Sequence, residues 1–319
     1  MTGEFERITR YFKPHAAEPA ARGLADDAAV LSVPDGHELV ISTDTAVSGV
    51  HFLHDAPADV AAQRAIGSAL SDLAAMGADP VGMTIAISLP PEMPLQWLDD
   101  FAATLGEDCK RFNCPLLGGD TTGIDGPPVI NVTVFGTVPR GQAIGRNGAQ
   151  LGDLLYVSGE IGGAGLGIEV LQGGFTALPR DLRQDLAHRH EMPEPRLSLG
   201  PQLRGVATAM LDISDGLLAD AAHIATTSNV VLQVDLRQLP LPVGARVALN
   251  AELVTVEDLA SFGDDYELLF TAPADAKLPE TDIPLTCIGK VVESGEAALI
   301  RPDGQAYDLT AGWDHFDDD

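Results

Sequence analysis

The sequence predicts a two-domain chain of the α/β class, in which each domain is a mixed sheet packed with helices. Its 319 residues suffice for two domains that each bury a core. Glycine is abundant, at 33 residues, and aromatic residues make up only 5%, which suits helices packed closely on sheets through small side chains. A glycine-rich polar segment over residues 139–153 is typical of a domain junction. We therefore expect domains over residues 1–140 and 141–319.

In the first domain, the spacing of apolar residues separates helices from strands. The long helix is the clearest element, because Gly77 favours a left-handed helix end and Pro80 follows it. Residues 128–138 alternate between apolar and polar side chains, as in a half-exposed strand. The expected elements are a helix over 3–12, a strand over 39–45, a helix over 59–76, a strand over 81–89, a helix over 97–112 and a strand over 128–138.

The second domain is expected to hold strands and a glycine-rich turn. The segment GEIGGAGLG, residues 159–167, opens a helix but does not fit G-x-G-x-x-G in any frame. The chain also lacks G-x-x-x-x-G-K-[ST], so it carries neither a Rossmann motif nor a P-loop. The other expected elements are strands over 153–158, 230–236, 286–292 and 297–300 and a charged helix over 181–191.

The formal net charge of −28 argues against several classes of partner. Such an acidic surface repels nucleic acid and anionic membranes, so neither is an expected partner. No apolar run approaches membrane-spanning length, and the N-terminus has no signal-peptide pattern. The cysteines Cys109, Cys114 and Cys287 form no C-x-x-C pair and are interpreted as reduced thiols. These observations predict a cytoplasmic protein.

Three stretches share one pattern, an apolar run that leads into aspartate and hydroxyl side chains. They are LVISTDT (39–45), PLLGGDTT (115–122) and AMLDISDGL (209–217). A strand that ends in this way places oxygen ligands at the carboxyl edge of a sheet, where open α/β sheets bind ligands. Taken singly, each stretch is better interpreted as a strand followed by an Asx-type turn. Their recurrence, with further acids at 26–27, 72 and 264–265, favours a shared site.

Converging carboxylates cannot all stay charged and unpaired, so these acids either spread over the surface or bind cations. Oxygen ligands select Mg²⁺ or Ca²⁺ over zinc, and Mg²⁺ combines one or two carboxylates with phosphate oxygens. Several Mg²⁺ ions around a polyphosphate indicate phosphoryl transfer. The residues alone therefore indicate a Mg²⁺-dependent enzyme that uses a nucleoside triphosphate without a P-loop. An acidic, non-catalytic protein that binds divalent cations is the alternative from another class.

The order of short motifs resembles the thiamine-monophosphate kinase family nearly from end to end. The matching motifs are GEF, RYF, DDAAV, ISTDT, GVHF, SDLAAMGADP, GGDTT, LDISDGL, GDDYELLF and a C-terminal WDHF. The resemblance implies transfer of the γ-phosphoryl group of ATP directly to thiamine monophosphate, giving thiamine diphosphate. It also implies a homodimer in which the N-terminal domains form a barrel. The alternative is a sibling ATP-dependent enzyme of the same fold, such as aminoimidazole ribonucleotide synthetase or selenophosphate synthetase.

The resemblance also assigns roles to residues. The implied Mg²⁺ ligands, for several ions, are Asp27, Ser42, Thr43, Asp44, Asp72, Asp120, Asp212 and Asp215. Among these, the implied catalytic residues are Asp44, Asp72, Asp120 and Asp212. The implied ATP contacts are Gly119, Asp120, Arg146 and Ser214. The implied contacts to the thiamine end are His51, Asp264 and Trp313, the last by ring stacking.

Two positions depart from the family pattern. The first motif normally reads G-x-G-D-D, and here Ala25 replaces its second glycine. The replacement is strained if the backbone φ at Ala25 is positive and silent otherwise. The later motif more often has glutamate where this chain has Asp264, which is one methylene shorter. Of the implied substrate contacts, Asp264 is the one this departure affects.

Overall fold

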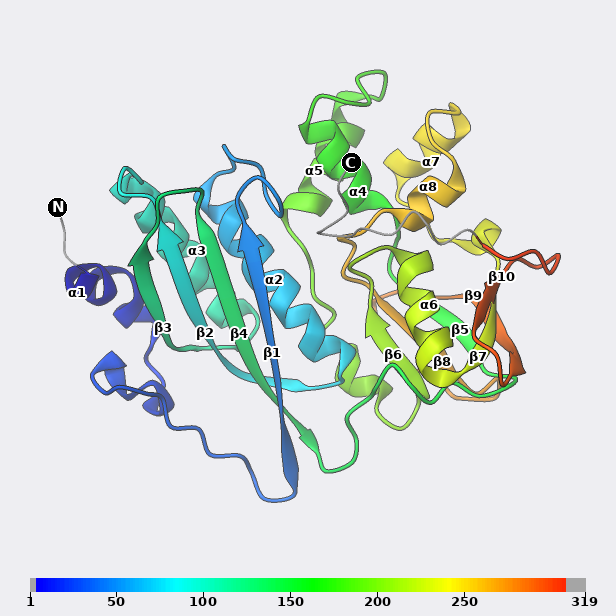
Figure 1. Ribbon diagram of the computed structural model, residues 1–319, viewed down its shortest axis with the longest axis horizontal. Helices are drawn as coiled ribbons and strands as arrows, with labels where there is room; N and C mark the ends of the chain where they lie inside the picture. Colours follow the sequence, from blue (N-terminus) through cyan, green and yellow to red (C-terminus); the bar gives the residue numbers. More distant parts are fainter. Residues whose placement is uncertain (1–3, 308–319) are drawn as a thin grey trace. The chain divides into compact units, whose positions relative to one another are not determined.

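The computed structural model of the protein describes residues 4–307. The chain forms two compact units, one with the residues up to Leu73 and from Ala78 to Gly141, the other with Ala74–Gly77 and the chain from Gln142 onward. Among the described residues there are two sheets, each packed with helices, which confirms the predicted mixed α/β class in two domains (Figure 1). Within residues 4–307 no helix is both long and apolar enough to cross a membrane.

The first unit contains a sheet in the order β1-β4-β2-β3. Its central strand β4 pairs antiparallel with both β1 and β2, and β2 pairs parallel with β3. Figure 1 shows α2 and α3 behind this sheet, on one face. The elements are α1 (Glu4–Arg7), a π-helical turn (Ile8–Phe12), 3-10 turns (Lys13–His15 and Pro19–Leu24), β1 (His37–Val47), α2 (Ala58–Ala75), β2 (Asp79–Leu89), α3 (Leu95–Arg111), β3 (Leu116–Gly123) and β4 (Val129–Pro139).

The two faces of this sheet differ in character. Ile130, Val132 and Val134 of β4 are fully buried on the face that the helices cover, together with Leu70 and Phe101. On the other face apolar side chains of β1 remain in solvent, since Leu39 is 40% exposed and Ile41 is 56% exposed in the single chain. We call this second surface the open face. Neighbouring exposed apolar side chains of this kind are common on protein interaction surfaces.

The long helix ends where the sequence predicts. The N–H of Gly77 donates to the carbonyl of Ala74, and the N–H of Ala78 donates to that of Leu73. This pair of hydrogen bonds, with a φ of +65° at Gly77, is a Schellman helix end. The prediction about strand ends is wrong in the first unit. Asp44 lies three residues before the end of β1 and Asp120 three residues before the end of β3, so both are interior strand positions.

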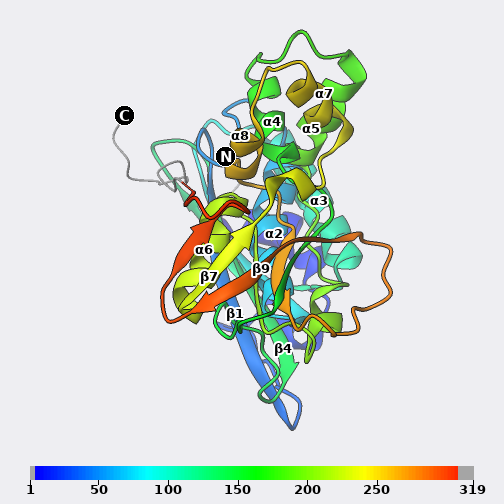
Figure 2. The same cartoon turned by 90° about the vertical axis from the view of Figure 1, so that its right-hand side faces the viewer.

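The second unit contains a sheet in the order β10-β7-β9-β5-β8-β6. Helix α6 packs beside it, and α4, α5, α7 and α8 pack together beyond one of its ends (Figure 2). Here Asp212 is the last residue of its strand, as predicted. The elements are β5 (Leu154–Ser158), α4 (Gly163–Leu171), α5 (Arg180–Glu191), β6 (Ala209–Asp212), α6 (Leu217–Ser228), β7 (Val230–Val234), α7 (Val243–Asn250), α8 (Val256–Ser261), β8 (Leu268–Ala272), β9 (Leu285–Ser294) and β10 (Ala298–Ile300), with 3-10 turns at Gly200–Leu203 and Leu236–Gln238.

Candidate active site

In the first unit, β1 and α2 bring together three of the predicted Mg²⁺ ligands. Ser42 and Asp44 pair with Val134 and Val132, whose side chains are buried, so both lie on the face that the helices cover. The Ser42 hydroxyl donates to Oδ2 of Asp72 on α2 at 2.5 Å. Asp44 and Asp72 are only partly exposed. One serine and two aspartates on one face offer oxygen atoms alone, the donor type that Mg²⁺ and Ca²⁺ prefer.

Thr43 and Asp120 lie on the opposite, open face. Thr43 pairs with Thr133 across the β1–β4 ladder, and Asp120 pairs with Ala86, the residue opposite Asn131. Thr43 Oγ1 lies 3.0 Å from Thr133 Oγ1. The structure therefore divides the predicted first-domain ligands between two faces of one sheet.

Asn131 of β4 forms hydrogen bonds with β1 but was not among the predicted site residues. Its side-chain amide donates to Thr45 Oγ1 at 2.8 Å and to the backbone carbonyl of Asp44 at 3.1 Å. The signal was available, because Asn131 and Thr133 are polar positions in an alternating strand that faces the hydroxyl side chains of β1. Asn131 thus fixes the backbone at Asp44 from the open face.

Three other predicted positions lie in loops of the first unit. Asp27 is exposed in the loop that follows the turn Pro19–Leu24. The φ at Ala25 is −108°, so its replacement of glycine is silent. His51 Nδ1 accepts the N–H of Val47 at 3.1 Å, which leaves Nε2 as the protonated nitrogen of the neutral ring. The guanidinium of Arg64 donates to the His51 carbonyl at 2.6 Å and holds this loop against α2.

In the second unit, the loop after β6 and the loop before β8 are joined by backbone hydrogen bonds. The N–H of Asp264 donates to the Ser214 carbonyl at 2.9 Å, and the N–H of Tyr266 donates to that of Ile213 at 2.9 Å. Ile213 in turn donates to the Glu267 carbonyl at 2.8 Å. The loop that carries the predicted ATP and Mg²⁺ contacts is therefore held directly against the loop that carries the predicted substrate contact.

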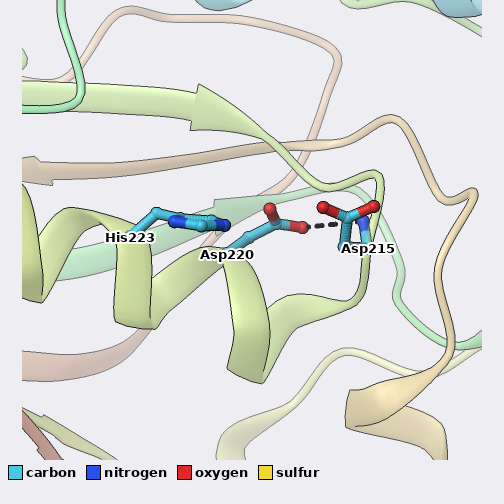
Figure 3. A group of neighbouring side chains, drawn as sticks. All are labelled: Asp215, Asp220 and His223. Atoms are coloured by element: carbon cyan, nitrogen blue, oxygen red, sulfur yellow. Dashed lines mark hydrogen bonds between the residues drawn. The ribbon is translucent and has the colours of Figure 1, made fainter. Parts of the chain in front are cut away.

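Asp220 on α6 lies beside the first of these loops (Figure 3). Its Oδ2 accepts the backbone N–H groups of Ser214 at 3.0 Å and Asp215 at 3.1 Å. Burial, together with the nearby charges of Asp215 and Asp212, raises the pKa of Asp220 to about 8. Ligand atoms of Asp215, Asp220 and His223 lie within 4.8 Å of one another. Sequence reasoning missed Asp220, because on a helix it resembles an ordinary first-turn acid.

Asp264, which departs from the family pattern, occupies a left-handed backbone conformation. Its φ is +68°, in the left-handed region that aspartate enters more readily than most residues. The hydroxyl of Tyr266 donates to Asp264 Oδ1 at 3.0 Å, and His190 Nδ1 lies 3.5 Å from Oδ2. The side chain of Asp264 is about one-third exposed.

The glycine-rich segment 159–167 serves packing, which explains why it fits no nucleotide-binding pattern. A Cβ on Gly165 would lie 2.2 Å from Phe262 Cβ, and one on Gly167 would lie 2.2 Å from the Leu186 carbonyl. At the start of α4 the N–H groups of Gly162 and Ala164 donate to the carboxylate of Asp265, at 2.6 and 3.2 Å. The position that would bind a phosphate in a dinucleotide site is thus filled by an aspartate.

Glu267 is the buried acid of the second loop, at 3% exposure. Arg196 donates to both of its carboxylate oxygens, and Ser158 Oγ donates to Oε2 at 2.5 Å. The same hydroxyl accepts the N–H of Leu268 at 2.9 Å. A bidentate arginine is the geometry that best compensates a buried carboxylate. This network ties the loop before β8 to the end of β5.

The buried carboxyl group of Asp265 should make the stability of the protein depend on pH. Burial raises its pKa from 3.8 to about 7, so between these values the folded protein binds a proton that the unfolded chain releases. Stability must therefore fall as the pH rises through this window. As the pH rises from about 4 to about 7, the free energy of unfolding of Asp265→Asn is expected to fall less than that of the wild type. Urea unfolding measures both.

A matched control is Asp235→Asn. Arg237 lowers the pKa of Asp235 below its ordinary 3.8, so its stabilising effect is lost only at more acidic pH. This variant should keep the wild-type decline between about pH 4 and pH 7. Equal declines for wild type and Asp265→Asn would contradict the prediction.

Arg146 and Trp313 are two further predicted residues. Arg146 is exposed in the loop before β5, and its carbonyl accepts the hydroxyls of Thr227 at 2.9 Å and Ser228 at 3.4 Å, at the end of α6. Ser228 Oγ also accepts the N–H of Gly148 at 3.1 Å. The backbone of this loop is therefore fixed while the Arg146 side chain stays in solvent. Trp313 lies outside the described residues.

Comparison with known proteins adds independent findings. Residues 25–138 match the family model for the N-terminal domain of AIR synthase related proteins, and residues 150–301 match the model for the C-terminal domain. The thiamine-monophosphate kinase of Escherichia coli (strain K12) is 38% identical over 324 residues, which cover 98% of each chain.

Two solved structures are also similar. The crystal structure of thiamine-monophosphate kinase from Stenotrophomonas maltophilia K279a has a TM-score of 0.79 at 39% identity and covers 89% of this chain and 91% of its own. The structure of AaThiL complexed with AMPPCP and TMP has a TM-score of 0.81 at 31% identity and covers 98% of this chain and 97% of its own. With relatives above 30% identity along nearly its whole length, this chain belongs to the thiamine-monophosphate kinase family, within the AIR synthase related proteins.

Proposed function

We propose that this chain transfers the γ-phosphoryl group of ATP to thiamine monophosphate, giving thiamine diphosphate and ADP, in thiamine diphosphate biosynthesis. The observation that carries the proposal is the match to a named thiamine-monophosphate kinase over 98% of both chains. It is supported by the similarity to a structure complexed with AMPPCP and TMP, a pair that corresponds to the two proposed substrates. The enzyme is proposed to bind ATP without a P-loop and to work in the cytoplasm.

The donor sets fit Mg²⁺. In the first unit, Ser42 Oγ and the carboxylates of Asp44 and Asp72 offer only oxygen. In the second, burial and then the charges of Asp215 and Asp212 raise the pKa of Asp220, and a divalent cation would relieve the repulsion among these carboxylates. The ions are proposed to be held by the residues that the family implies, which include members of both sets: Asp27, Ser42, Thr43, Asp44, Asp72, Asp120, Asp212 and Asp215.

The proposed mechanism relies on positioning rather than on a strong base. The acceptor is already a phosphate anion, so deprotonation contributes little and anion–anion repulsion is the main obstacle. Mg²⁺ held by the carboxylates named above would supply the positive charge that neutralises the phosphates and orients the reacting groups. Among the chain's own residues, Arg146, Ser214 and the Gly119 backbone are proposed to contact ATP. His51, Asp264 and Trp313 are proposed to orient the thiamine end.

We further propose that the N-terminal unit, residues 1–140, carries ATP binding and dimerisation, and that residues 141–319 complete the nucleotide and substrate site. The dimer is proposed to pair two copies through the open face into a barrel. The exposed Leu39 and Ile41 support this assignment, because a second copy would bury them. Ile41→Glu should therefore shift the protein from dimer to monomer in analytical ultracentrifugation. A wild-type monomer would contradict the proposal.

The decisive experiment incubates the purified protein with ATP, Mg²⁺ and thiamine monophosphate and detects thiamine diphosphate by chromatography. Product should form only when all three are present. Absence of product, together with turnover of another substrate of the AIR synthase related family, would favour the sibling-enzyme alternative. Binding of divalent cations without any turnover would favour the non-catalytic alternative.

A further inference from the structure

Asp220 is an acid whose burial the proposed reaction does not itself explain. The residue is 2% exposed and lies in the first turn of α6. Its Oδ2 accepts two consecutive backbone N–H groups, those of Ser214 and Asp215. Figure 3 draws the hydrogen bond between Asp215 and Asp220. A buried backbone donor without an acceptor is costly, so removal of this carboxylate would release the loop or leave both donors unsatisfied.

The loop from Ile213 to Gly216 is held on its other side by backbone contacts. Asp264 donates to the Ser214 carbonyl, and a Cβ on Gly216 would lie 2.4 Å from the Ser261 carbonyl. On the side of α6, the carboxylate of Asp220 holds the N–H groups of Ser214 and Asp215. Ser214 is a proposed ATP contact and Asp215 is a proposed Mg²⁺ ligand. Asp220 therefore fixes the backbone positions from which both side chains extend.

A direct role as Mg²⁺ ligand is the competing explanation, because the ligand atoms of Asp215 and Asp220 are close. The geometry favours the indirect role. Oδ2 already accepts two N–H groups, and the residue is almost fully shielded from solvent. If Asp220 bound Mg²⁺ directly, its negative charge would be essential. If it only holds the loop, an acceptor oxygen at this position is sufficient.

We propose that Asp220 is a positioning residue, which fixes the backbone at Ser214 and Asp215 and so preorganises the Asp212–Asp215 loop for Mg²⁺ and the nucleotide. The proposal rests on the proposed function for the identity of the ligands. Groups that orient metal ligands typically contribute about 10–100-fold to metal affinity. The effect should therefore appear as a weaker response to Mg²⁺ with a smaller change in kcat at saturating Mg²⁺.

The test compares Asp220→Asn with Asp220→Ala. Asparagine keeps an acceptor oxygen, so the Mg²⁺ concentration for half-maximal activity should stay within about threefold of wild type. Alanine removes the acceptor, so that concentration should rise about 10–100-fold. Asp220→Leu, which fills the space without an acceptor, replaces the alanine variant if the latter does not fold. Asp235→Ala is the control, because Asp235 accepts the N–H of Arg237 in a turn without proposed ligands.

Hydrogen exchange gives a readout that needs no activity. In Mg²⁺-free wild type and Asp220→Asn, the amides of Ser214 and Asp215 should be protected, and in Asp220→Ala or Asp220→Leu they should exchange faster. Rapid exchange of both amides in the wild type would overturn the proposal. So would an Asp220→Asn variant as impaired as Asp220→Ala, since that result indicates a charged ligand. If wild type fails to phosphorylate thiamine monophosphate, the proposed function is lost, while the exchange data still report on Asp220.

Discussion

Asp44→Asn is expected to lower kcat by about 10³-fold or more, because it removes a full negative charge from the proposed Mg²⁺ site of the first unit. The fold should survive the change. Asp44 is only partly buried, and the hydrogen bond that its Oδ1 accepts from the Thr45 N–H at 2.8 Å can be kept by the asparagine oxygen. Steady-state kinetics at saturating substrates, with a urea unfolding curve of the same preparation, measures both effects.

The matched control is Asp35→Asn, which removes one charge from the exposed turn just before β1. Its kcat should stay close to that of the wild type, because only a charge at the site matters. If both variants lose activity equally, the net charge of the unit is responsible rather than a ligand. If Asp44→Asn unfolds without Mg²⁺ while wild type stays folded, Asp44 has a structural role.

Gly119→Ala is expected to destabilise the first unit by about 3 kcal/mol or more. Gly119 lies in β3 opposite Ile85, and a Cβ there would lie 1.9 Å from the Ile85 carbonyl oxygen. The clash is with the backbone of the neighbouring strand, so it can be relieved only by separating β2 from β3. Because Asp120 follows directly, the same distortion should also reduce activity.

Gly118→Ala is the control for this variant. The nearest atom to its added Cβ would be Thr84 Cγ2 at 3.8 Å, an ordinary contact, so stability should change by less than about 1 kcal/mol. Urea midpoints of the two variants, followed by a probe in the first unit, provide the comparison. Equal midpoints would show that the strands separate at little cost and that close approach does not explain the glycine.

The elements that the sequence predicted best are those with a local signal at each end. The helix expected over 59–76 is α2 (Ala58–Ala75), because Gly77 supplies the left-handed helix end where the chain needs it. The strand expected over 128–138 is β4 (Val129–Pro139), since its alternating pattern reflects one buried and one open face. Both signals act over a few residues, so no tertiary information is required.

Strand ends were harder to predict in the first unit. The hydroxyl and carboxylate residues of β1 resemble a turn in sequence, yet they continue the strand because β4 offers partners along its whole length. The same holds for Asp120 within β3. On the open face of a sheet, the side chain of a polar residue contacts solvent while its backbone pairs with the neighbouring strand. Local sequence cannot distinguish that environment from a loop.

Contacts between distant segments could not be predicted at all. Asp265 caps a helix whose first residues lie about 100 positions earlier, and Glu267 meets Ser158 across a similar separation. Each residue appeared in the motif GDDYELLF, where only Asp264 received a role. Its neighbours hold the loop in place, and nothing in their spacing identifies the partners.

The pairing of β1 with β4 restricts how this family can change in length. Eleven residue pairs from His37 to Val47 follow one another without a shift, whereas both pairings of β2 contain an irregularity, between Pro80 and Gly82 and between Met83 and Thr84. A single inserted or deleted residue before Asp44 would move its carboxylate to the open face and break the group with Ser42 and Asp72. Insertions and deletions among relatives should therefore collect outside β1, and a gap placed within residues 37–47 of an alignment should be treated as an alignment error.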